Sequence, residues 1–257
     1  MTPRLVAIVP AAGLSRRMGQ PKLLLDLAGR TVIARVIEAL RDAGIARCLV
    51  VVRPADTDLM QEVTTAGGEV VLPATDPADM RQSVEWALRG VGNGESGVGG
   101  GIRSEVVPRS FCSLSPTIGV AVCEDSTVGE RAGVRGPSPT PDSPLPTPCD
   151  GWVLIPADHP TLHSQLVRVL IAAWSTSPSQ IAVPVYDGQR GHPTIFPWSL
   201  ADEVFHLPPD QGLNQVLRSD PQRVLEVPVS DPRVLDDLDT PEDLLRLRAE
   251  LEHRTGS

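Results

Sequence analysis

Short apolar runs alternate with amphipathic stretches along the first ninety residues of the chain. Continuous apolar runs are typical of strands buried in a parallel sheet, whereas apolar positions that recur every three or four residues indicate helices. The expected strands are residues 5–10, 48–52 and 69–72, and the expected helices are residues 32–40, 58–66 and 80–89. This alternation implies right-handed strand–helix–strand units, and therefore a three-layer α/β/α arrangement with a mostly parallel central sheet.

The alternating pattern resumes after residue 150. We expect strands at residues 152–155, 181–185, 194–196 and 224–227, and helices at 164–174, 212–218 and 241–252. The last helix has the clearest start, because Thr240 supplies a capping hydroxyl, Pro241 suits the first helical position and the acids that follow favour the positive end of the helix dipole. The second half of the chain therefore extends the same α/β domain.

Residues 92–150 break this pattern. Glycine, proline and serine dominate the segment, with a glycine cluster at 97–101 and a proline-rich stretch at 137–141. Such a composition cannot bury enough apolar surface to offset an ordering cost of about 1–2 kcal/mol per residue. We therefore expect a single domain over residues 1–257, interrupted by a mostly disordered insertion at 92–150. The insertion would leave the sheet at the edge opposite to the one where ligands bind.

Composition and charge limit the classes of function. The 257 residues carry a formal net charge of −9, which argues against a nucleic-acid binder, because such proteins usually present a basic face. No apolar run reaches the roughly 18 residues of a membrane span, and the first four residues show no signal-peptide pattern. The four cysteines form no Cys-x-x-Cys pair, which favours free thiols. We expect a cytoplasmic protein without nucleic-acid or membrane partners.

The first predicted strand leads into a glycine-rich, basic segment at residues 10–22. The segment ends at Lys22, the only lysine in the chain, and a compact ammonium on a flexible stem suits a phosphate. Gly13 and Gly19 allow tight turns that expose backbone N–H groups, and Arg17 adds charge. The spacing matches neither a Walker A loop nor Gly-x-Gly-x-x-Gly. The segment predicts a triphosphate site, the alternative being a turn with solvated arginines.

Acidic side chains after two predicted elements suggest a cation site. Asp158 follows the strand at 152–155, so it would stand at the carboxyl edge of the sheet; its alternative role is a helix cap. A second acidic cluster at 236–243 spans the start of the last helix. Mg²⁺ prefers one or two carboxylates together with phosphate oxygens and waters. His159, which lies between Asp158 and Pro160, is expected to be a turn residue without a catalytic role.

The glycine-rich segment resembles the signature loop of MobA-like nucleotidyltransferases, particularly molybdenum cofactor cytidylyltransferases. The matching residues are Ala11-Ala12-Gly13-Leu14-Ser15-Arg16-Arg17-Met18-Gly19 and Lys22. The resemblance implies a Rossmann-like nucleotidyltransferase fold in which Arg17 and Lys22 are catalytic, because they hold phosphates and stabilise the transferring group. It also implies a nucleotide site made by Ala11, Ala12, Gly13, Ser15, Arg17, Gly19, Lys22 and Ser83. The Ala-Ala-Gly sequence at residues 11–13 resembles that of cytidylyltransferases, which favours CTP over GTP.

The same resemblance implies a metal and an acceptor site. Magnesium would be the cofactor, bound by Asp158 and Asp237, with Asp239 as an alternative ligand that could equally serve the start of the helix. The Arg-Gly-His-Pro segment is similar to one on the acceptor side of these enzymes, which places Arg190 and His192 near the acceptor phosphate. The local sequence fits a structural hairpin at least as well.

The activity implied by the resemblance is transfer of CMP from CTP to the terminal phosphate of molybdopterin, with release of pyrophosphate. It would also imply transient contact with a molybdoenzyme or chaperone. Residues 210–213 depart from the family's usual acidic-glycine segment, which leaves the acceptor open. The alternatives are GTP as donor, a sugar phosphate or methylerythritol phosphate as acceptor, a heterocycle oxidoreductase on the same fold, and a non-catalytic accessory module.

Overall fold

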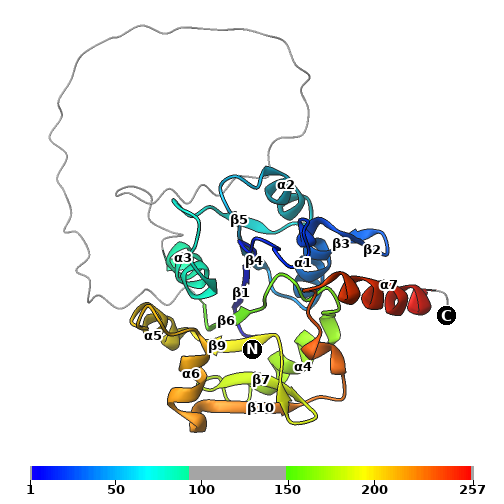
Figure 1. Cartoon of the computed structure of the whole chain (residues 1–257). Helices are drawn as coiled ribbons and strands as arrows, with labels where there is room; N and C mark the ends of the chain where they lie inside the picture. Colours follow the sequence, from blue (N-terminus) through cyan, green and yellow to red (C-terminus); the bar gives the residue numbers. More distant parts are fainter. Residues whose placement is uncertain (1, 93–148, 256–257) are drawn as a thin grey trace, which may run out of the picture.

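In the part of the chain that the structure describes, an eight-stranded mixed sheet runs through the centre (Figure 1). The computed structural model describes residues 2–92 and 149–255. The strands of the sheet are β1 (Leu5–Pro10), β4 (Arg47–Val51), β5 (Glu69–Val71), β6 (Gly151–Leu154), β7 (Ile181–Tyr186), β8 (Gln189–Arg190), β9 (Thr194–Pro197) and β10 (Val224–Pro228). A separate two-stranded hairpin consists of β2 (Asp26–Leu27) and β3 (Arg30–Thr31).

Seven α-helices and four short 3₁₀ turns accompany these strands in the described residues. The helices are α1 (Val32–Asp42), α2 (Thr57–Thr65), α3 (Met80–Gly92), α4 (Ser164–Trp174), α5 (Ala201–Phe205), α6 (Asn214–Ser219) and α7 (Pro241–Thr255). The 3₁₀ turns are η1 (Lys22–Leu24), η2 (Trp198–Leu200), η3 (Pro221–Arg223) and η4 (Pro232–Leu235).

The strand order explains why distant segments meet at one edge. The order is β10-β7-β9-β6-β1-β4-β5, with β8 paired to β7. The central strand β1 pairs in parallel with both β4 and β6, so that Ile8 stands opposite Leu49 on one side and Leu154 on the other. Among the strands of this sheet in the described residues, only β8 and β9 run antiparallel to the others. The carboxyl ends of β1, β4 and β6 therefore lie side by side, as expected for a mostly parallel sheet.

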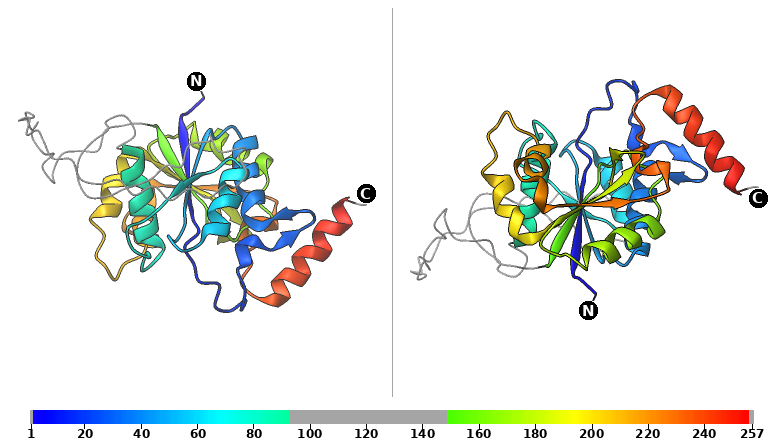
Figure 2. Two further views of the ribbon diagram at one scale, coloured as in Figure 1. Left: turned by 90° about the horizontal axis from the view of Figure 1, so that it is seen from above. Right: turned by 90° about the horizontal axis from the view of Figure 1, so that it is seen from below.

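Two apolar cores cover the two faces of the sheet, because successive side chains of a strand point to opposite faces. Along β1, Ala7 and Val9 pack with α1, α2, α4 and α7, whereas Val6 and Ile8 pack with α3, α5 and α6. Trp152 of β6 stacks on Phe196 of β9 in the second core, with ring centroids 4.1 Å apart. The helices on either side of the sheet are visible in both views of Figure 2. The expectation of a three-layer α/β/α fold is confirmed.

The predicted strands and helices are all present within a few residues of their expected ends. The pattern missed the hairpin β2–β3, which lies beside α7 (Figure 2), and the short helix α5. Of the insertion expected at 92–150, Gly92 belongs to α3 and residues 93–148 lie outside the described residues. Its expected last residue, Asp150, belongs instead to the ordered domain, because its backbone N–H donates to Arg4 O at 2.8 Å. No helix in the described ranges has the length and apolarity to cross a bilayer.

Candidate active site

The loop between β1 and η1 folds back on itself around Ser15. The backbone N–H groups of Met18 and Gly19 donate to Ser15 O at 3.1 and 3.2 Å, and the N–H of Lys22 reaches Ser15 Oγ at 3.4 Å. Ser15 and Gly19 adopt positive φ angles of 47° and 65°, which glycine tolerates well and which confirm the tight turn expected at Gly19. Gly13 does not have a positive φ; a Cβ there would meet nothing within 4 Å. Gly13 therefore leaves open space rather than making a turn.

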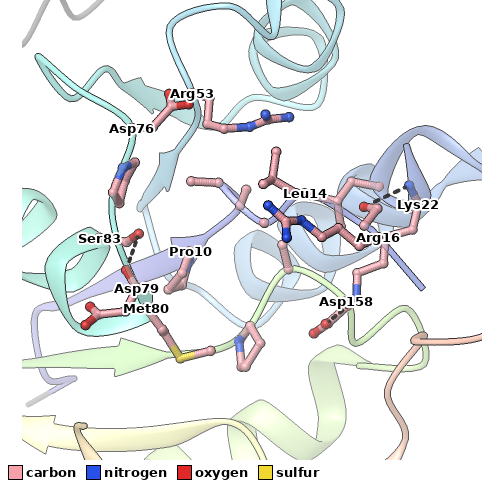
Figure 3. A pocket seen from close by; sticks show the side chains of 18 of the residues that line it. Pro10, Leu14, Arg16, Lys22, Arg53, Asp76, Asp79, Met80, Ser83 and Asp158 are labelled. Atoms are coloured by element: carbon pink, nitrogen blue, oxygen red, sulfur yellow. Dashed lines mark hydrogen bonds and ion pairs between the residues drawn. The ribbon is translucent and has the colours of Figure 1, made fainter. Parts of the chain in front are cut away.

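A cavity of about 460 Å³ lies between this loop, the start of α3 and the end of β6 (Figure 3). The predicted nucleotide-binding residues that line it are Ala11, Ala12, Gly13, Ser15, Arg17, Lys22 and Ser83. Gly19 lines a second cavity of about 480 Å³, which shares Ala11, Gly13 and Ser15 with the first. Asp158 and Asp239 also line the first cavity. Seven of the eight residues that the resemblance implies for the nucleotide site therefore line one cavity, and Gly19 does not.

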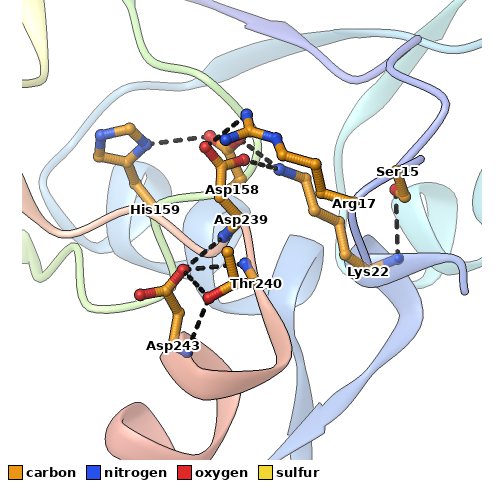
Figure 4. Close-up of polar contacts among 8 residues, drawn as sticks. All are labelled: Ser15, Arg17, Lys22, Asp158, His159, Asp239, Thr240 and Asp243. Carbon is orange, nitrogen blue, oxygen red and sulfur yellow. Dashed lines mark hydrogen bonds and ion pairs between the residues drawn. The ribbon is translucent and has the colours of Figure 1, made fainter. Parts of the chain in front are cut away.

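Lys22 bridges two carboxylates from distant parts of the chain (Figure 4). Its Nζ lies 2.7 Å from Asp158 Oδ2 and 2.9 Å from Asp239 Oδ1. Arg17 joins the same group, because its guanidinium lies 2.7 Å from Asp239 Oδ2. The Lys22 side chain is only 13% exposed, whereas Arg17 is 71% exposed. Lys22 is thus part of the cavity wall, where two carboxylates contact it. Arg17 is exposed and pairs with one carboxylate, that of Asp239.

The charges of this group are mutually stabilised. Burial opposes the charged form of Lys22, but the charge of Asp158 and hydrogen bonds to Asp158 and Asp239 outweigh it and raise the pKa of Lys22. Burial also opposes the charged form of Asp158, yet a hydrogen bond from His159 and the charge of Lys22 hold the pKa of Asp158 well below its usual range. The ammonium and the carboxylate are therefore both ionised at neutral pH.

Asp239, rather than Asp237, meets Lys22. The alternative role of Asp239 at the helix start is filled by Asp243, whose Oδ2 accepts from the Thr240 N–H and hydroxyl, each at 2.8 Å, and from the Asp239 N–H at 3.2 Å. The side chain of Asp239 is therefore available to the cations. Asp237 is exposed; partial desolvation, and then the charges of Asp239 and Asp158, raise its pKa. Its predicted role as a metal ligand stays a prediction.

The two predicted acceptor residues point to different surroundings. Arg190 is exposed and forms an ion pair with Glu226 of β10 at 2.8 Å. His192 lies edge-on against His159, with ring centroids 4.9 Å apart, and His159 in turn contacts Asp158. Burial lowers the pKa of His192 to about 3, which keeps its ring neutral. Neither residue lines the cavity formed by the described part of the chain.

Ser83 lies at the end of the cavity away from Lys22 (Figure 3). It is 2% exposed, and its hydroxyl donates to Asp79 O at 3.2 Å. Three further residues at this end were missed by the sequence reasoning: Arg53, Asp76 and Asp79. Arg53 directly follows the apolar run of β4 at the same sheet edge, and Asp79 caps α3 by accepting from the Gln82 N–H at 2.8 Å. The sequence could have indicated two of these residues: Arg53 is a charged residue at the end of a predicted strand, and Asp79 begins an Asp-x-x-Gln pattern typical of a helix start.

Comparison with known proteins places this geometry in a family. A model of the MobA-like NTP transferase domain matches residues 7–224. The chain belongs to this family. The MobA-like NTP transferase is 26% identical over 245 residues to the purine catabolism protein PucB of Bacillus subtilis strain 168, a match that covers 94% of this chain and 95% of that protein.

A second relative matches more closely over a shorter stretch. The MobA-like NTP transferase is 38% identical over 92 residues to a 2-C-methyl-D-erythritol 4-phosphate cytidylyltransferase of Frankia casuarinae. That match spans 35% of this chain and 34% of the relative, so about a third of each protein. This shorter match is thus also to a nucleotidyltransferase by name.

Solved structures share the fold over almost the whole chain. A nucleotidyl transferase from Methanothermobacter, Mth528, superposes with a TM-score of 0.65 at 18% identity, covering 98% of this chain and 99% of that one. The Mycobacterium tuberculosis protein Rv0371c in complex with manganese has a TM-score of 0.61 at 21% identity, covering 96% and 98%. At these identities the likeness extends to the fold alone.

Proposed function

We propose that this MobA-like NTP transferase transfers CMP from CTP to the terminal phosphate of molybdopterin and releases pyrophosphate. The observation that carries the proposal is the meeting of Lys22, Asp158 and Asp239 at one wall of the cavity that the signature loop surrounds. These three residues come from three separate segments, and only the fold brings them together. A cation between two carboxylates, beside a loop with further arginines, suits a polyphosphate and its metal.

Transfer requires little covalent chemistry from the protein. An oxygen of the acceptor phosphate forms a bond to the α-phosphorus of CTP, while the bond from that phosphorus to the bridging oxygen breaks and pyrophosphate leaves with the electron pair. The acceptor phosphate is already anionic, so no side chain has to remove a proton. Lys22 and Arg17 would offset the charge that develops on the phosphate oxygens, and the loop would hold the triphosphate in place.

The two carboxylates fit a divalent cation. Asp158 and Asp239 converge on a single cationic atom, Nζ of Lys22, at 2.7 and 2.9 Å, so one small cation can contact both. The described residues contain no cluster of three or more metal-ligating side chains. Mg²⁺ does not require one, because it commonly takes one or two carboxylates and completes its shell with phosphate oxygens and waters. When bound, the cation would supply positive charge to those oxygens.

CTP is favoured by the loop and by a relative. The Ala-Ala-Gly sequence resembles that of cytidylyltransferases, and the Frankia protein that matches over 92 residues is a cytidylyltransferase by name. Molybdopterin as acceptor rests on the resemblance of the loop and of the Arg-Gly-His-Pro segment, with Arg190 and His192 toward the acceptor side. The name of the Frankia relative supports methylerythritol phosphate as the second candidate acceptor.

The test is pyrophosphate release from each of the four ribonucleoside triphosphates with MgCl₂ and each acceptor separately. We expect release with CTP and molybdopterin, and neither acceptor nor CTP alone should suffice. Preference for GTP would overturn the choice of donor, and release only with methylerythritol phosphate would overturn the choice of acceptor. Bound flavin or consumption of nicotinamide without pyrophosphate would favour the oxidoreductase. Nucleotide binding that is independent of magnesium, without turnover, would favour the accessory module.

A further inference from the structure

His159 contacts the carboxylate that the proposed function uses most. It follows Asp158 directly, is 6% exposed, and its Nδ1 lies 3.2 Å from Asp158 Oδ1. The other oxygen, Oδ2, lies 2.7 Å from Nζ of Lys22. An ionised carboxylate only accepts hydrogen bonds, so the proton of the His159 contact is on Nδ1. Each oxygen of Asp158 therefore has a donor of its own (Figure 4).

The ring of His159 is itself held from a second segment. His192 packs edge-on against it at 83° between the ring planes. The backbone N–H of His192 donates to Val234 O at 2.9 Å, and a Cβ on Gly191 would lie 2.3 Å from the same oxygen. Gly191 therefore permits a close approach that no larger residue would allow. The segment that fixes the His159 ring is thus anchored on η4.

A backbone hydrogen bond near His159 also joins the two segments that carry Asp158 and Asp239. The backbone N–H of Leu238 donates to Asp158 O at 2.9 Å, which ties the segment that ends in Asp239 to the end of β6. His159 stands where these two segments and the His192 turn meet. Its hydrogen bond opposes rotation of the Asp158 carboxylate about its last side-chain bond, so that Oδ2 stays turned toward the Lys22 ammonium that Asp239 also contacts.

We propose that His159 is a positioning residue, which holds the Asp158 carboxylate in the orientation that a divalent cation shared with Asp239 requires. The inference rests on the proposed function, because it concerns the same cation. Hydrogen bonds to metal-ligating side chains from neighbouring residues commonly change metal affinity or activity by about 10- to 100-fold when removed. The role differs from a simple turn residue, which would affect folding and not metal affinity.

The experiment compares His159→Leu with His159→Asn. Asparagine can place an amide N–H close to the position of Nδ1, whereas leucine fills space without a donor. Mn²⁺ is titrated into the folded protein with CTP and without acceptor, and the loss of the EPR signal of free Mn²⁺ is measured against the same titration without protein, which accounts for the complex of Mn²⁺ with CTP alone. We expect His159→Leu to weaken Mn²⁺ binding by about 10- to 100-fold, and His159→Asn to stay within about threefold of the wild type.

A second histidine–aspartate pair provides the control. His163 Nε2 lies 2.6 Å from Asp231 Oδ2, and neither residue lines the cavity among the described residues. His163→Leu should leave Mn²⁺ affinity within about threefold of the wild type, a smaller change than a ligand-positioning residue gives. Thermal unfolding establishes that each variant is folded. Should His159→Leu not fold, His159→Ala replaces it in the comparison with His159→Asn.

Three results would overturn the inference: equal Mn²⁺ affinity in His159→Leu and the wild type, equal loss in the leucine and asparagine variants, or no Mn²⁺ binding by the wild type. Failure of the proposed function is a separate result. If the wild type releases no pyrophosphate with any nucleotide, the transfer reaction is wrong, while the Mn²⁺ titration still decides whether His159 positions Asp158.

Discussion

The two ends of the cavity are built in different ways. At the Lys22 end, ion pairs of 2.7–2.9 Å join the loop, the end of β6 and the segment before α7. At the Ser83 end, the contacts are local: the hydroxyl of Ser83 reaches Asp79 O, four residues earlier, and Arg53 lies 3.6 Å from Asp56, three residues later. The first end needs the whole fold, and the second needs one helix start and one turn.

This difference predicts a division of labour. Charged groups that are held rigidly by partners from several segments can stabilise developing charge without reorganising, which lowers the barrier of the chemical step. Neutral hydrogen-bonding groups at a helix start can select one nucleoside over another, because an unpaired polar group costs about 1–3 kcal/mol. Substitutions at the Lys22 end should therefore lower kcat, and those at the Ser83 end should change KM and nucleotide preference.

Lys22→Ala gives the largest expected effect. Removing the ammonium should lower kcat for pyrophosphate release by about 10²- to 10³-fold, the cost typical of losing one donor that stabilises transition-state charge. The fold should persist, because Arg17 still pairs with Asp239 and His159 still donates to Asp158. Unchanged turnover would remove the lysine from the mechanism.

The matched control for this change is Arg30→Ala. Arg30 is 63% exposed and pairs with Glu38 at 3.5 Å, so it is a cation of the hairpin β2–β3 outside the cavity. Exposed ion pairs contribute about 0–1 kcal/mol, so this variant should have wild-type turnover and nearly the same unfolding midpoint. An equal loss of turnover in both variants would mean that the effect of Lys22→Ala is not specific to the cavity.

A comparison of Asp239→Asn with Asp237→Asn tests which of the two aspartates acts at the Lys22 end of the cavity. Asp239 contacts Lys22 and Arg17 through its two oxygens, so its neutral isostere should lower turnover on the order of 10²-fold and raise the Mg²⁺ concentration needed for half-maximal rate. Asp237→Asn removes a charge that Asp158 and Asp239 repel, and its effect should stay below about fivefold. A larger effect at Asp237 would make that residue the second ligand, as the resemblance implies.

The fold was predictable from the sequence where an element is long enough to show a clear pattern of apolar residues. The runs of β1, β4 and β6 and the apolar face of α1 are clear, because buried strands and amphipathic helices require them. The hairpin β2–β3 has two residues in each strand and α5 has five residues. Such short elements cannot show a periodic pattern of apolar positions. The antiparallel direction of β9 depends on which strands it joins, and no local pattern records this.

The site was predictable in part for a similar reason. Asp158 stands at the end of a recognisable strand, and β6 lies next to β1, so its meeting with Lys22 follows from topology. The choice between Asp237 and Asp239 depends on how Thr240 and Asp243 cap α7, which sets the direction of each side chain. That direction is a property of three-dimensional geometry. The contact of His159 with Asp158 depends equally on the turn that holds its ring.

Ser83→Ala tests the other end and should give the smallest effect. The Ser83 hydroxyl donates its proton to Asp79 O, so only its lone pairs remain to face the cavity. Lone pairs accept from an amino group, which cytosine carries where uracil has a carbonyl oxygen. Loss of one such bond, about 1 kcal/mol, should raise KM for CTP about fivefold with kcat unchanged, and should narrow the preference for CTP over UTP.

The control for this last variant is Ser175→Ala. The Ser175 hydroxyl also donates to the carbonyl four residues earlier, Ile171 O at 2.7 Å, at the end of α4 and outside the cavity lined by described residues. Steady-state kinetics with CTP and UTP should therefore separate the two serines, with only Ser83→Ala changing the ratio of kcat/KM. A fall in kcat without a change in KM would place Ser83 at the transferring phosphate. The two ends of the cavity would then share the chemical step.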